Sequence, residues 1–493
     1  MTAVPSIDPR TGATAEIVAG ETSTAQVDAF CRAALAAAAP LEALGRDGRA
    51  ALLDTLADAL EEDRAPIVEV ADRETALGTT RLTGELIRTT YQLRHFAEVL
   101  RDGGCLEATV DHAGDTPMGP RPDLRRMLVP LGPVAVFGAS NFPLAFSVPG
   151  GDTASALAAG CPVVVKAHGS HPATSQLCFE VLDAAARRTG APAGTLGIVH
   201  GVRAGADLVA HPAIRAAGFT GSTAGARALM AVIDRRSDPI PFFGELSSLN
   251  PVVVTPAAAA ERAAEIGAGL AGSVTLGAGQ FCTKPGLAFV PDGPGGDLLI
   301  AAIRDTFAGK PPMVMLNAGI AAAYEKGTAR LGNPASRGTP LLITAAASAL
   351  PPEATEECFG PVVVVARYGN EQELFGALDK LPSSLTASIH RGHAETDLPG
   401  EVARRLLPRA GRIVYDGYPT GVAVSWAQHH GGPWPATNTQ HTSVGASAIR
   451  RFLRPVAWQN APADLLPAEL RDEYRGIPRR VDGVLHPAGD DKT

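Results

Sequence analysis

Hydrophobic and polar positions follow two different rhythms along the chain. Residues 24–111 are Ala-rich, and over 47–77 the apolar residues stand three and four apart, which predicts amphipathic helices. From residue 133 onward, short apolar runs alternate with helical stretches such as 174–188. Because continuous apolar runs are typical of strands buried on both faces, we expect parallel strands at 133–139, 162–166, 195–201, 216–221 and 241–245.

A second series of the same kind follows. It begins at the apolar run 250–254, continues through an Ala-rich helix at 257–272 and reaches the run 361–366. Strand–helix–strand repeats of this type form an open parallel sheet with helices on both faces. The chain is therefore predicted to be an α/β protein with two open, doubly wound parallel-sheet domains.

Length and composition agree with an ordinary globular protein. The chain has 493 residues, 45% hydrophobic and 19% charged, which is too long for one simple core. Its formal net charge of −8 argues against nucleic acid or an acidic membrane surface as a partner. No apolar run reaches membrane-spanning length, and the N-terminus lacks the features of a signal peptide. We expect a cytoplasmic protein.

The cysteines and histidines show no pattern of a disulfide framework or a metal site. The six cysteines are scattered without paired spacing, which predicts reduced thiols and no zinc cluster. His429 and His430 are adjacent, but no Cys or acidic residue stands at helical spacing from them. We therefore predict no metal site.

Two loops carry a candidate nucleophile and a candidate base. Cys282 lies in the Gly-rich string GQFCTKPG (279–286), and Glu245 lies in PFFGELSSLNP (241–251). A thiolate is a strong nucleophile, and a carboxylate can accept a proton from the thiol or from water. Taken alone, this pair indicates catalysis only weakly, because an isolated Cys is more often a small buried hydrophobe.

Of two glycine motifs, one is a candidate phosphate site and the other indicates helix packing. FTGSTAG (219–225) follows a predicted strand and opens a predicted helix, whose N-terminal N–H groups favour a phosphate; the alternative is an ordinary turn capped by Ser222. A G-x-G-x-x-G pattern at Gly267, Gly269 and Gly272 follows a helical stretch instead of a strand. We expect only close helix packing there.

Taken together and in order, five segments resemble the aldehyde dehydrogenase superfamily over most of the chain, to about residue 455. They are FGASNFPLAFS (137–147), VVVKAHGS (163–170), FTGSTAG (219–225), FGEL with the later GQFC, and EECFGPVVVV (356–365). The resemblance implies Cys282 as nucleophile, Glu245 as base and Asn141 as part of the oxyanion hole. The chain departs from the family in having ELSSLNP for ELGGKNP and Ser140 where Trp is common.

The resemblance also implies a nicotinamide dinucleotide. Its binding residues would be Lys166, His168, Gly169, Ser170, Gly221, Ser222, Gly225, Glu357 and Phe359. Lys166 would hold the adenosine ribose, Ser222 the pyrophosphate and Glu357 the nicotinamide ribose, with Phe359 against the nicotinamide. Where the family often has an acid that selects NAD, this chain has Gly169, and His168 and Lys166 would attract a 2′-phosphate. We expect NADP, with NAD as the alternative.

The expected reaction is oxidation of an aldehyde to a carboxylic acid through a cysteine thiohemiacetal and thioester. ASNFPLAFS, the Gly-rich stretch 148–168 and the loop 429–445 resemble the branch that converts 2-oxoglutarate semialdehyde (2,5-dioxopentanoate) to 2-oxoglutarate. Alternatives are another aliphatic, fatty or semialdehyde substrate, a CoA-acylating enzyme, or a noncatalytic binding protein. Glu245 argues against the second, and Cys282, Glu245 and Asn141 together argue against the third.

Two further segments suggest assembly. Residues 112–130 are Gly-, Pro- and Arg-rich, typical of an extended arm, and 447–460 is a late extended run. In the family both form the oligomerisation element, so we expect a homodimer or a dimer of dimers. The expected division is 1–111 with 131–246 for dinucleotide binding, 247–430 for catalysis, 112–130 with 431–460 for assembly, and a partly loose tail at 461–493.

Overall fold

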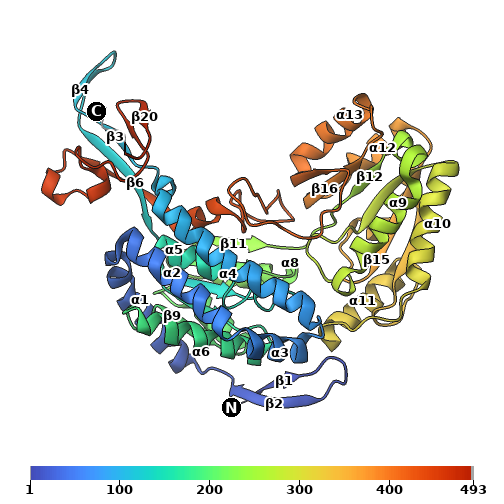
Figure 1. Cartoon of the computed structure of the whole chain (residues 1–493), viewed down its shortest axis with the longest axis horizontal. Helices are drawn as coiled ribbons and strands as arrows, with labels where there is room; N and C mark the ends of the chain where they lie inside the picture. The colour runs from blue at the N-terminus through green and yellow to red at the C-terminus, as the bar shows by residue number, and fades with distance from the viewer. Residues whose placement is uncertain (1, 490–493) are drawn as a thin grey trace.

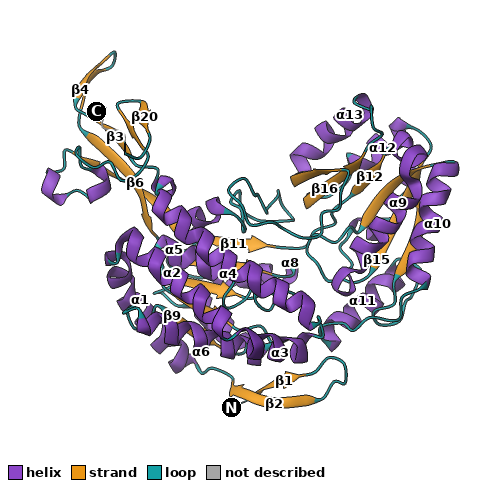
Figure 2. Ribbon diagram, in the orientation of Figure 1, coloured by secondary structure: helices purple, strands orange, loops and turns teal. Residues whose placement is uncertain are grey.

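The computed structural model describes residues 2–489. It has two lobes, each a parallel sheet covered by helices on both faces, and a β arm that extends from the first lobe (Figures 1 and 2). The two-sheet α/β architecture predicted from the sequence is confirmed.

The first lobe contains a five-stranded parallel sheet with the order β11-β10-β7-β8-β9. All five strands expected from the apolar runs are present: β7 Val134–Phe137, β8 Val163–Lys166, β9 Leu196–Val199, β10 Ala216–Thr220 and β11 Phe242–Glu245. The connecting helices are α5 Gly151–Ala159, α6 Pro172–Arg188, α7 Val202–Ala210 and α8 Thr223–Ile233. The strand order reverses between β7 and β10, which is where ligands bind in open sheets of this kind.

Four N-terminal helices precede this sheet. They are α1 Thr24–Ala43, α2 Gly45–Glu62, α3 Arg64–Thr75 and α4 Thr79–Asp102, and a hairpin of β1 Ala3–Ile7 and β2 Thr14–Gly20 comes before them. The amphipathic pattern predicted over 47–77 is confirmed in α2, where Leu52, Leu56 and Leu60 are buried. Leu82 and Leu86 of α4 are buried in the same cluster, which also contains residues of β7 and β8. The remaining face of α4 carries Arg81 and Arg88 toward the site described below.

The second lobe contains a six-stranded parallel sheet with the order β14-β15-β13-β12-β16-β17. Its strands are β12 Val252–Val254, β13 Leu287–Pro291, β14 Leu341–Ala346, β15 Val362–Tyr368, β16 Ser384–His390 and β17 Ala410–Tyr415. The helices α9 Pro256–Thr275 and α10 Pro294–Ala308 pack on one face, and α11 Ala318–Arg330, α12 Glu371–Leu378 and α13 Asp397–Leu406 on the other. The expected strands at 250–254 and 361–366 and the helix at 257–272 are therefore confirmed.

The G-x-G-x-x-G pattern lies inside α9. A Cβ on Gly267 would stand 2.4 Å from the carbonyl oxygen of Leu299 in α10, and one on Gly269 would stand 2.3 Å from the Tyr418 hydroxyl. These two glycines allow close packing behind the second sheet, as predicted.

The arm is a five-stranded sheet with the order β18-β6-β3-β19-β20. It contains β3 Thr109–Asp111, β6 Leu124–Pro130, β18 Leu453–Gln459, β19 Arg479–Val481 and β20 Val484–His486, and a small hairpin of β4 Gly114–Thr116 and β5 Gly119–Arg121 extends from it. The extended conformation expected for 112–130 is confirmed. Strand β18 lies at the edge of this sheet and pairs antiparallel with β6 of its own chain.

The described part of the C-terminal segment differs from the partly loose tail expected there. Strand β19 pairs with β3, and Leu466, Leu470 and Ile477 are buried against Leu106 and Val110. These apolar residues stand in short 3₁₀ turns and loops, which have no helical or strand period for sequence analysis to detect.

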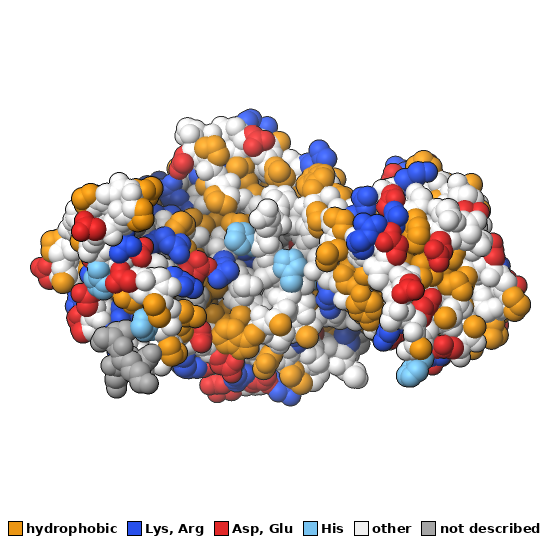
Figure 3. Space-filling view, turned by 90° about the horizontal axis from the view of Figure 1, so that it is seen from above, with side chains coloured by type: hydrophobic (Ala, Val, Ile, Leu, Met, Phe, Trp, Pro, Cys, Tyr) orange, Lys and Arg blue, Asp and Glu red, His pale blue; other side chains and the backbone are white. Residues whose placement is uncertain are grey.

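Within residues 2–489, no helix is both long and apolar enough to cross a bilayer. Seen from above, the second lobe is set apart from the rest by a waist, and acidic and basic side chains are interspersed over this face (Figure 3).

Candidate active site

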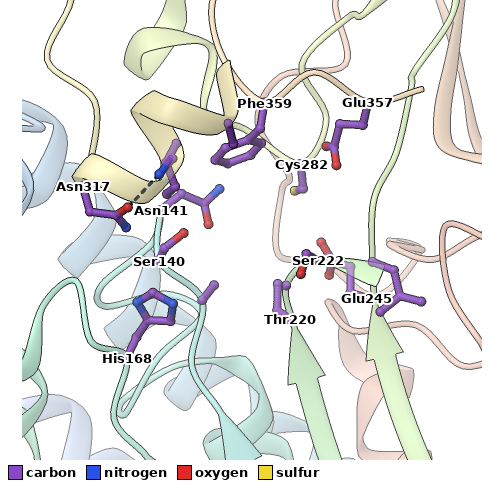
Figure 4. Close-up of a pocket in the computed structure, with 15 residues that line it drawn as sticks. Ser140, Asn141, His168, Thr220, Ser222, Glu245, Cys282, Asn317, Glu357 and Phe359 are labelled. Carbon is purple, nitrogen blue, oxygen red and sulfur yellow. Dashed lines mark hydrogen bonds between the residues drawn. The ribbon is translucent and has the colours of Figure 1, made fainter. Parts of the chain in front are cut away.

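A cavity of about 350 Å³ lies between the carboxyl ends of the first sheet and α11 of the second lobe (Figure 4). Its lining residues are Ala139, Ser140, Asn141, His168, Thr220, Gly221, Ser222, Glu245, Leu246, Cys282, Asn317, Ile320, Ala323, Glu357 and Phe359. The loops after β7, β8 and β10 and the end of β11 contribute to it because carboxyl ends of parallel strands meet at one edge. The second lobe contributes the Cys282 loop, the start of α11 and the segment before β15.

Most of the predicted site residues meet in this cavity. The candidate catalytic residues Cys282, Glu245 and Asn141 all line it. The candidate cofactor residues His168, Gly221, Ser222, Glu357 and Phe359 also line it, whereas Lys166, Gly169, Ser170 and Gly225 do not. Asn317, which the sequence analysis missed, caps the N-terminus of α11; its position before an Ala-rich helical stretch is the signal that could have found it.

The loop that carries Cys282 is held by two asparagines. Asn250, the Asn of the ELSSLNP string, donates through Nδ2 to the carbonyl oxygens of Cys282 at 2.8 Å and Lys284 at 3.1 Å. Asn141 donates through Nδ2 to the carbonyl oxygen of Gln280 at 2.8 Å. Before Cys282 the backbone is left-handed at Gly279, where a Cβ would stand 2.3 Å from the backbone of Gly360. The thiol is thus fixed by its backbone on both sides.

Asn141 is itself held from the side of α4. The Nη2 of Arg81 donates to the Asn141 carbonyl oxygen at 2.7 Å, and the Arg81 guanidinium lies over the rings of Phe142 and Phe281. One N–H of the Asn141 amide is used by Gln280, which leaves a second N–H on a side chain that lines the cavity.

Glu245 is bound by two side chains from the loop 429–445. His430 Nε2 lies 2.9 Å from Glu245 Oε1, and the Ser443 hydroxyl donates to Oε2 at 2.7 Å. The same His430 Nε2 lies 3.7 Å from Cys282 Sγ. The loop reaches the site because it pairs with the end of β11, where the Leu246 N–H donates to the Ala436 carbonyl at 2.8 Å.

His430 was not predicted to belong to any site, because no Cys or acidic residue stands at helical spacing from it in the sequence. The fold brings the thiol of Cys282, the carboxylate of Glu245 and the imidazole of His430 within 4.8 Å of one another. Its partners come from distant parts of the chain, so spacing gives no signal of the contact.

The electrostatics of the pair favour a thiol beside a carboxylate in the resting site. Burial raises the pKa of Glu245, but His430, through its charge when protonated and its hydrogen bond, and the Ser443 hydroxyl together lower that pKa below its ordinary value. Burial and the neighbouring Glu245 raise the pKa of the Cys282 thiol well above its ordinary value. The proton therefore stays on Sγ in the resting site, and Glu245 is the neighbouring carboxylate that can accept it when the thiol reacts.

Glu357 has a different environment in the same cavity. Burial raises its pKa to about 7, and the nearby Lys284 and hydrogen bonds from Ser247 and Ser248 oppose that increase. Lys284 is itself buried, which lowers its pKa, and its Nζ donates to the carbonyl oxygens of Cys358 and Val362. Glu357 can thus exchange between acceptor and donor forms near neutral pH.

The proposed adenosine end of the site is less charged than the sequence indicated. Burial, with His171 and Lys166 nearby, lowers the pKa of His168 well below its ordinary value, so this ring is neutral and adds no attraction for a 2′-phosphate. Burial also lowers the pKa of Lys166. The Ser170 hydroxyl accepts from Asn317 Nδ2 at 2.7 Å, which links the two lobes. A Cβ on Gly169 would have no heavy atom within 4 Å.

Comparisons with known proteins agree with this site. Residues 1–305 match the family model described as "Aldehyde dehydrogenase family". The alpha-ketoglutaric semialdehyde dehydrogenase 2 of Azospirillum brasilense is 45% identical over 492 residues, covering 94% of this chain and 93% of that protein. The alpha-ketoglutaric semialdehyde dehydrogenase of Acinetobacter baylyi is 43% identical over 480 residues, covering 93% and 91%. The crystal structure of aldehyde dehydrogenase 21 from Physcomitrella patens, with succinate bound, shares the fold at a TM-score of 0.79 and 19% identity, covering 93% of this chain and 95% of that one.

Proposed function

Because the chain belongs to the aldehyde dehydrogenase family, we propose that it oxidises 2-oxoglutarate semialdehyde to 2-oxoglutarate and uses NADP as the hydride acceptor. The observation that carries the proposal is one cavity lined by the Cys282 thiol, the Glu245 carboxylate and the Asn141 amide. The two relatives named for alpha-ketoglutaric semialdehyde support the substrate.

The first step in this proposal is addition of Cys282 to the aldehyde. A proton moves from Sγ to the Glu245 carboxylate, and the thiolate forms a bond to the aldehyde carbon. The oxygen becomes an oxyanion that accepts hydrogen bonds from the free N–H of Asn141 and the backbone N–H of Cys282. Asn250 and Arg81 keep these donors in place through the hydrogen bonds they make to the Cys282 and Asn141 carbonyls.

Features of the cavity support binding of the nicotinamide and pyrophosphate parts of a dinucleotide. It extends from Cys282 to Ser222, which caps the start of α8, where backbone N–H groups favour a pyrophosphate. Gly221 is needed there for packing, since a Cβ would stand 2.8 Å from the Phe219 ring. When bound, the cofactor would accept a hydride from the tetrahedral carbon and leave a thioester on Cys282.

Glu245 then completes the cycle as a base. Once the proton taken from Sγ has been released to solvent, the carboxylate takes a proton from a water molecule that attacks the thioester carbonyl. Cys282 then leaves as a thiolate and receives that proton from Glu245, which restores the thiol and the carboxylate as the acid departs. The lowered pKa of Glu245 keeps it ionised at neutral pH and ready to accept that proton.

The proposed NADP preference rests on space and charge near the end of β8. No atom lies within 4 Å of a Cβ at Gly169, so a 2′-phosphate has room, and no carboxylate stands at that position to repel it. The ammonium of Lys166 would provide the positive charge, since His168 is neutral.

Arg88 is our proposed partner for the remote carboxylate of the substrate. Its Nε donates to the Val422 carbonyl at 3.2 Å and its guanidinium lies over the Phe146 ring at 5.2 Å, but the buried Nη2 has no partner among the described residues. Burial lowers the pKa of Arg88, and the charge of Glu85, followed by those of Cys282 and Glu245, opposes that effect. A buried guanidinium with a free N–H favours a carboxylate.

Steady-state kinetics test the substrate and the cofactor together. We expect the highest kcat/KM for 2-oxoglutarate semialdehyde with NADP, ahead of succinic semialdehyde, hexanal and the same aldehydes with NAD. Arg88→Met should raise KM for the semialdehyde by about tenfold or more while leaving hexanal unchanged. A higher kcat/KM for hexanal than for the semialdehyde would overturn the proposed substrate, and equal use of both cofactors would overturn the NADP preference.

We also propose that the arm joins two copies of the chain. Strand β18 is an edge strand, and an exposed edge invites pairing with another chain. Light scattering should give a particle of at least twice 50.7 kDa, and truncation before residue 447 should abolish assembly. A 50.7 kDa particle at working concentration would contradict the proposal.

A further inference from the structure

His430 is a buried group that the proposed reaction leaves without a role. Its side chain is 1% exposed, and its ring lies 6.2 Å from that of Phe146. The backbone N–H of His430 donates to Thr442 Oγ1 at 2.8 Å, and its carbonyl accepts from the Ser443 N–H at 2.9 Å. The ring is therefore fixed both by packing and through its backbone.

The surroundings of the two ring nitrogens differ sharply. Nε2 lies 2.9 Å from Glu245 Oε1 and 3.7 Å from Cys282 Sγ. Nδ1 is buried, and no hydrogen-bond partner for it is found among the described residues. A proton on Nδ1 would be a buried donor without an acceptor, which is costly, whereas a proton on Nε2 is given to an acceptor. The geometry therefore places the donated ring proton on Nε2.

We propose that His430 is a positioning residue whose single Nε2–H serves two acceptors in turn, the ionised Glu245 carboxylate in the resting site and the Cys282 thiolate once the thiol proton has moved. In that step the S–H bond breaks, an O–H bond forms on Glu245, and the imidazole neither gains nor loses a proton. The negative charge passes from oxygen to sulfur, and both atoms already lie close to Nε2. The inference rests on the proposed function, because it concerns activation of the same thiol.

A different role would be that of a base that takes the thiol proton on Nε2. That role requires a free lone pair on Nε2, and hence either an Nδ1–H without a partner or a doubly protonated ring after transfer. A donor role and a base role therefore predict different responses to replacement by an amide, which can donate but cannot take up the proton.

The test compares His430→Gln with His430→Leu, and uses His429→Leu as a matched control from the same loop. Alkylation of Cys282 by iodoacetamide in the cofactor-free enzyme reports thiolate formation directly, and the pre-steady-state burst of reduced NADP reports the same step during turnover. We expect His430→Leu to slow both by about 10- to 150-fold, the rate equivalent of one hydrogen bond to a charged group. His430→Gln should lose less than about tenfold, and the control should be unchanged.

The outcomes distinguish a donor role of His430 from a base role and from no role. Equal loss in His430→Gln and His430→Leu, with thermal unfolding and NADP affinity as in the parent, overturns the donor role in favour of a base. Parental rates in both variants overturn any role of His430 in activation. If no aldehyde in the panel is oxidised, the proposed function fails, but the alkylation rates still report on the thiol and His430.

Discussion

Two glutamates line one cavity, Glu245 buried and Glu357 half-buried, and their surroundings shift their pKa values in opposite directions. At the end of β11, Glu245 receives hydrogen bonds from His430 and Ser443, and its pKa is lowered in spite of burial. Before β15, burial of Glu357 prevails over the nearby Lys284 and raises its pKa to about 7. Burial raises the pKa of both side chains, so the charges and donors beside each carboxyl decide which glutamate is an ionised base. The difference assigns the proton-accepting role to Glu245.

Glu245→Gln should have the largest effect on turnover. The amide keeps the shape but cannot accept a proton, so we expect kcat to fall by about 10²- to 10⁴-fold, the usual contribution of a general base. Thioester hydrolysis should slow more than hydride transfer, so a burst of reduced NADP should persist in stopped-flow absorbance. Loss of the burst with an unchanged steady-state rate would show that Glu245 does not act in hydrolysis.

Gly169→Glu places a third carboxylate near the cofactor, at a position with no steric obstacle to it. Repulsion of a 2′-phosphate should shift the ratio of kcat/KM for NADP over NAD toward NAD by about 5- to 150-fold. Gly169→Gln is the matched control, which adds similar bulk without charge. The same shift in both variants would mean that size, not charge, sets the preference.

Glu357→Gln should remove the pH dependence of NADP binding. In the parent, NADP affinity should rise as pH increases through about 7, because the ionised carboxylate is the better acceptor for ribose hydroxyls. The variant should lose that dependence and bind NADP about tenfold more weakly above pH 7, measured by fluorescence titration. An unchanged pH profile would remove Glu357 from the cofactor site.

Stability gives a second test of the same residue. A carboxyl with a raised pKa holds its proton longer in the folded state, so stability is lost as pH rises from about 4.5 to about 7. Glu357→Gln removes that loss and should raise the free energy of unfolding at pH 8 by up to about 3 kcal/mol. Chemical denaturation at pH 5 and pH 8 measures it, and a gain at pH 5 as large as that at pH 8 would contradict the ionisation argument.

Ser443→Ala should have the smallest effect on turnover of these substitutions. It removes one of the donors to Glu245 and leaves His430 in place, so kcat should fall by about five- to tenfold with KM unchanged. Ser443→Thr, which keeps the hydroxyl, should restore most of the rate. Failure of Thr to restore it would point to packing and not to the hydrogen bond.

Local patterns predicted the elements of this molecule well where burial is regular. The apolar runs of β7 to β11 are buried on both faces of a parallel sheet, so they are continuous in sequence. Leu466 and Ile477 are equally buried but stand in irregular segments, and the order of the C-terminal segment was missed for that reason.

Some site residues could likewise be predicted from local motifs, and others could not. Cys282, Glu245 and Asn141 stand in motifs of adjacent residues that the family resemblance made recognisable. His430 acts through contacts with distant parts of the chain, and the neutrality of His168 depends on burial, neither of which has a local signature. Folding alone brings such residues into the site.

The proposed reaction passes through a thioester on Cys282 that Glu245 helps to hydrolyse. Mass spectrometry of rapidly quenched Glu245→Gln enzyme, mixed with 2-oxoglutarate semialdehyde and NADP, tests it most directly. We predict close to one acyl group per chain, located on the peptide that contains Cys282, and neither adduct nor reduced NADP in Cys282→Ala. Reduced NADP formed by Cys282→Ala at the parental rate, or an adduct on another residue, would contradict the account.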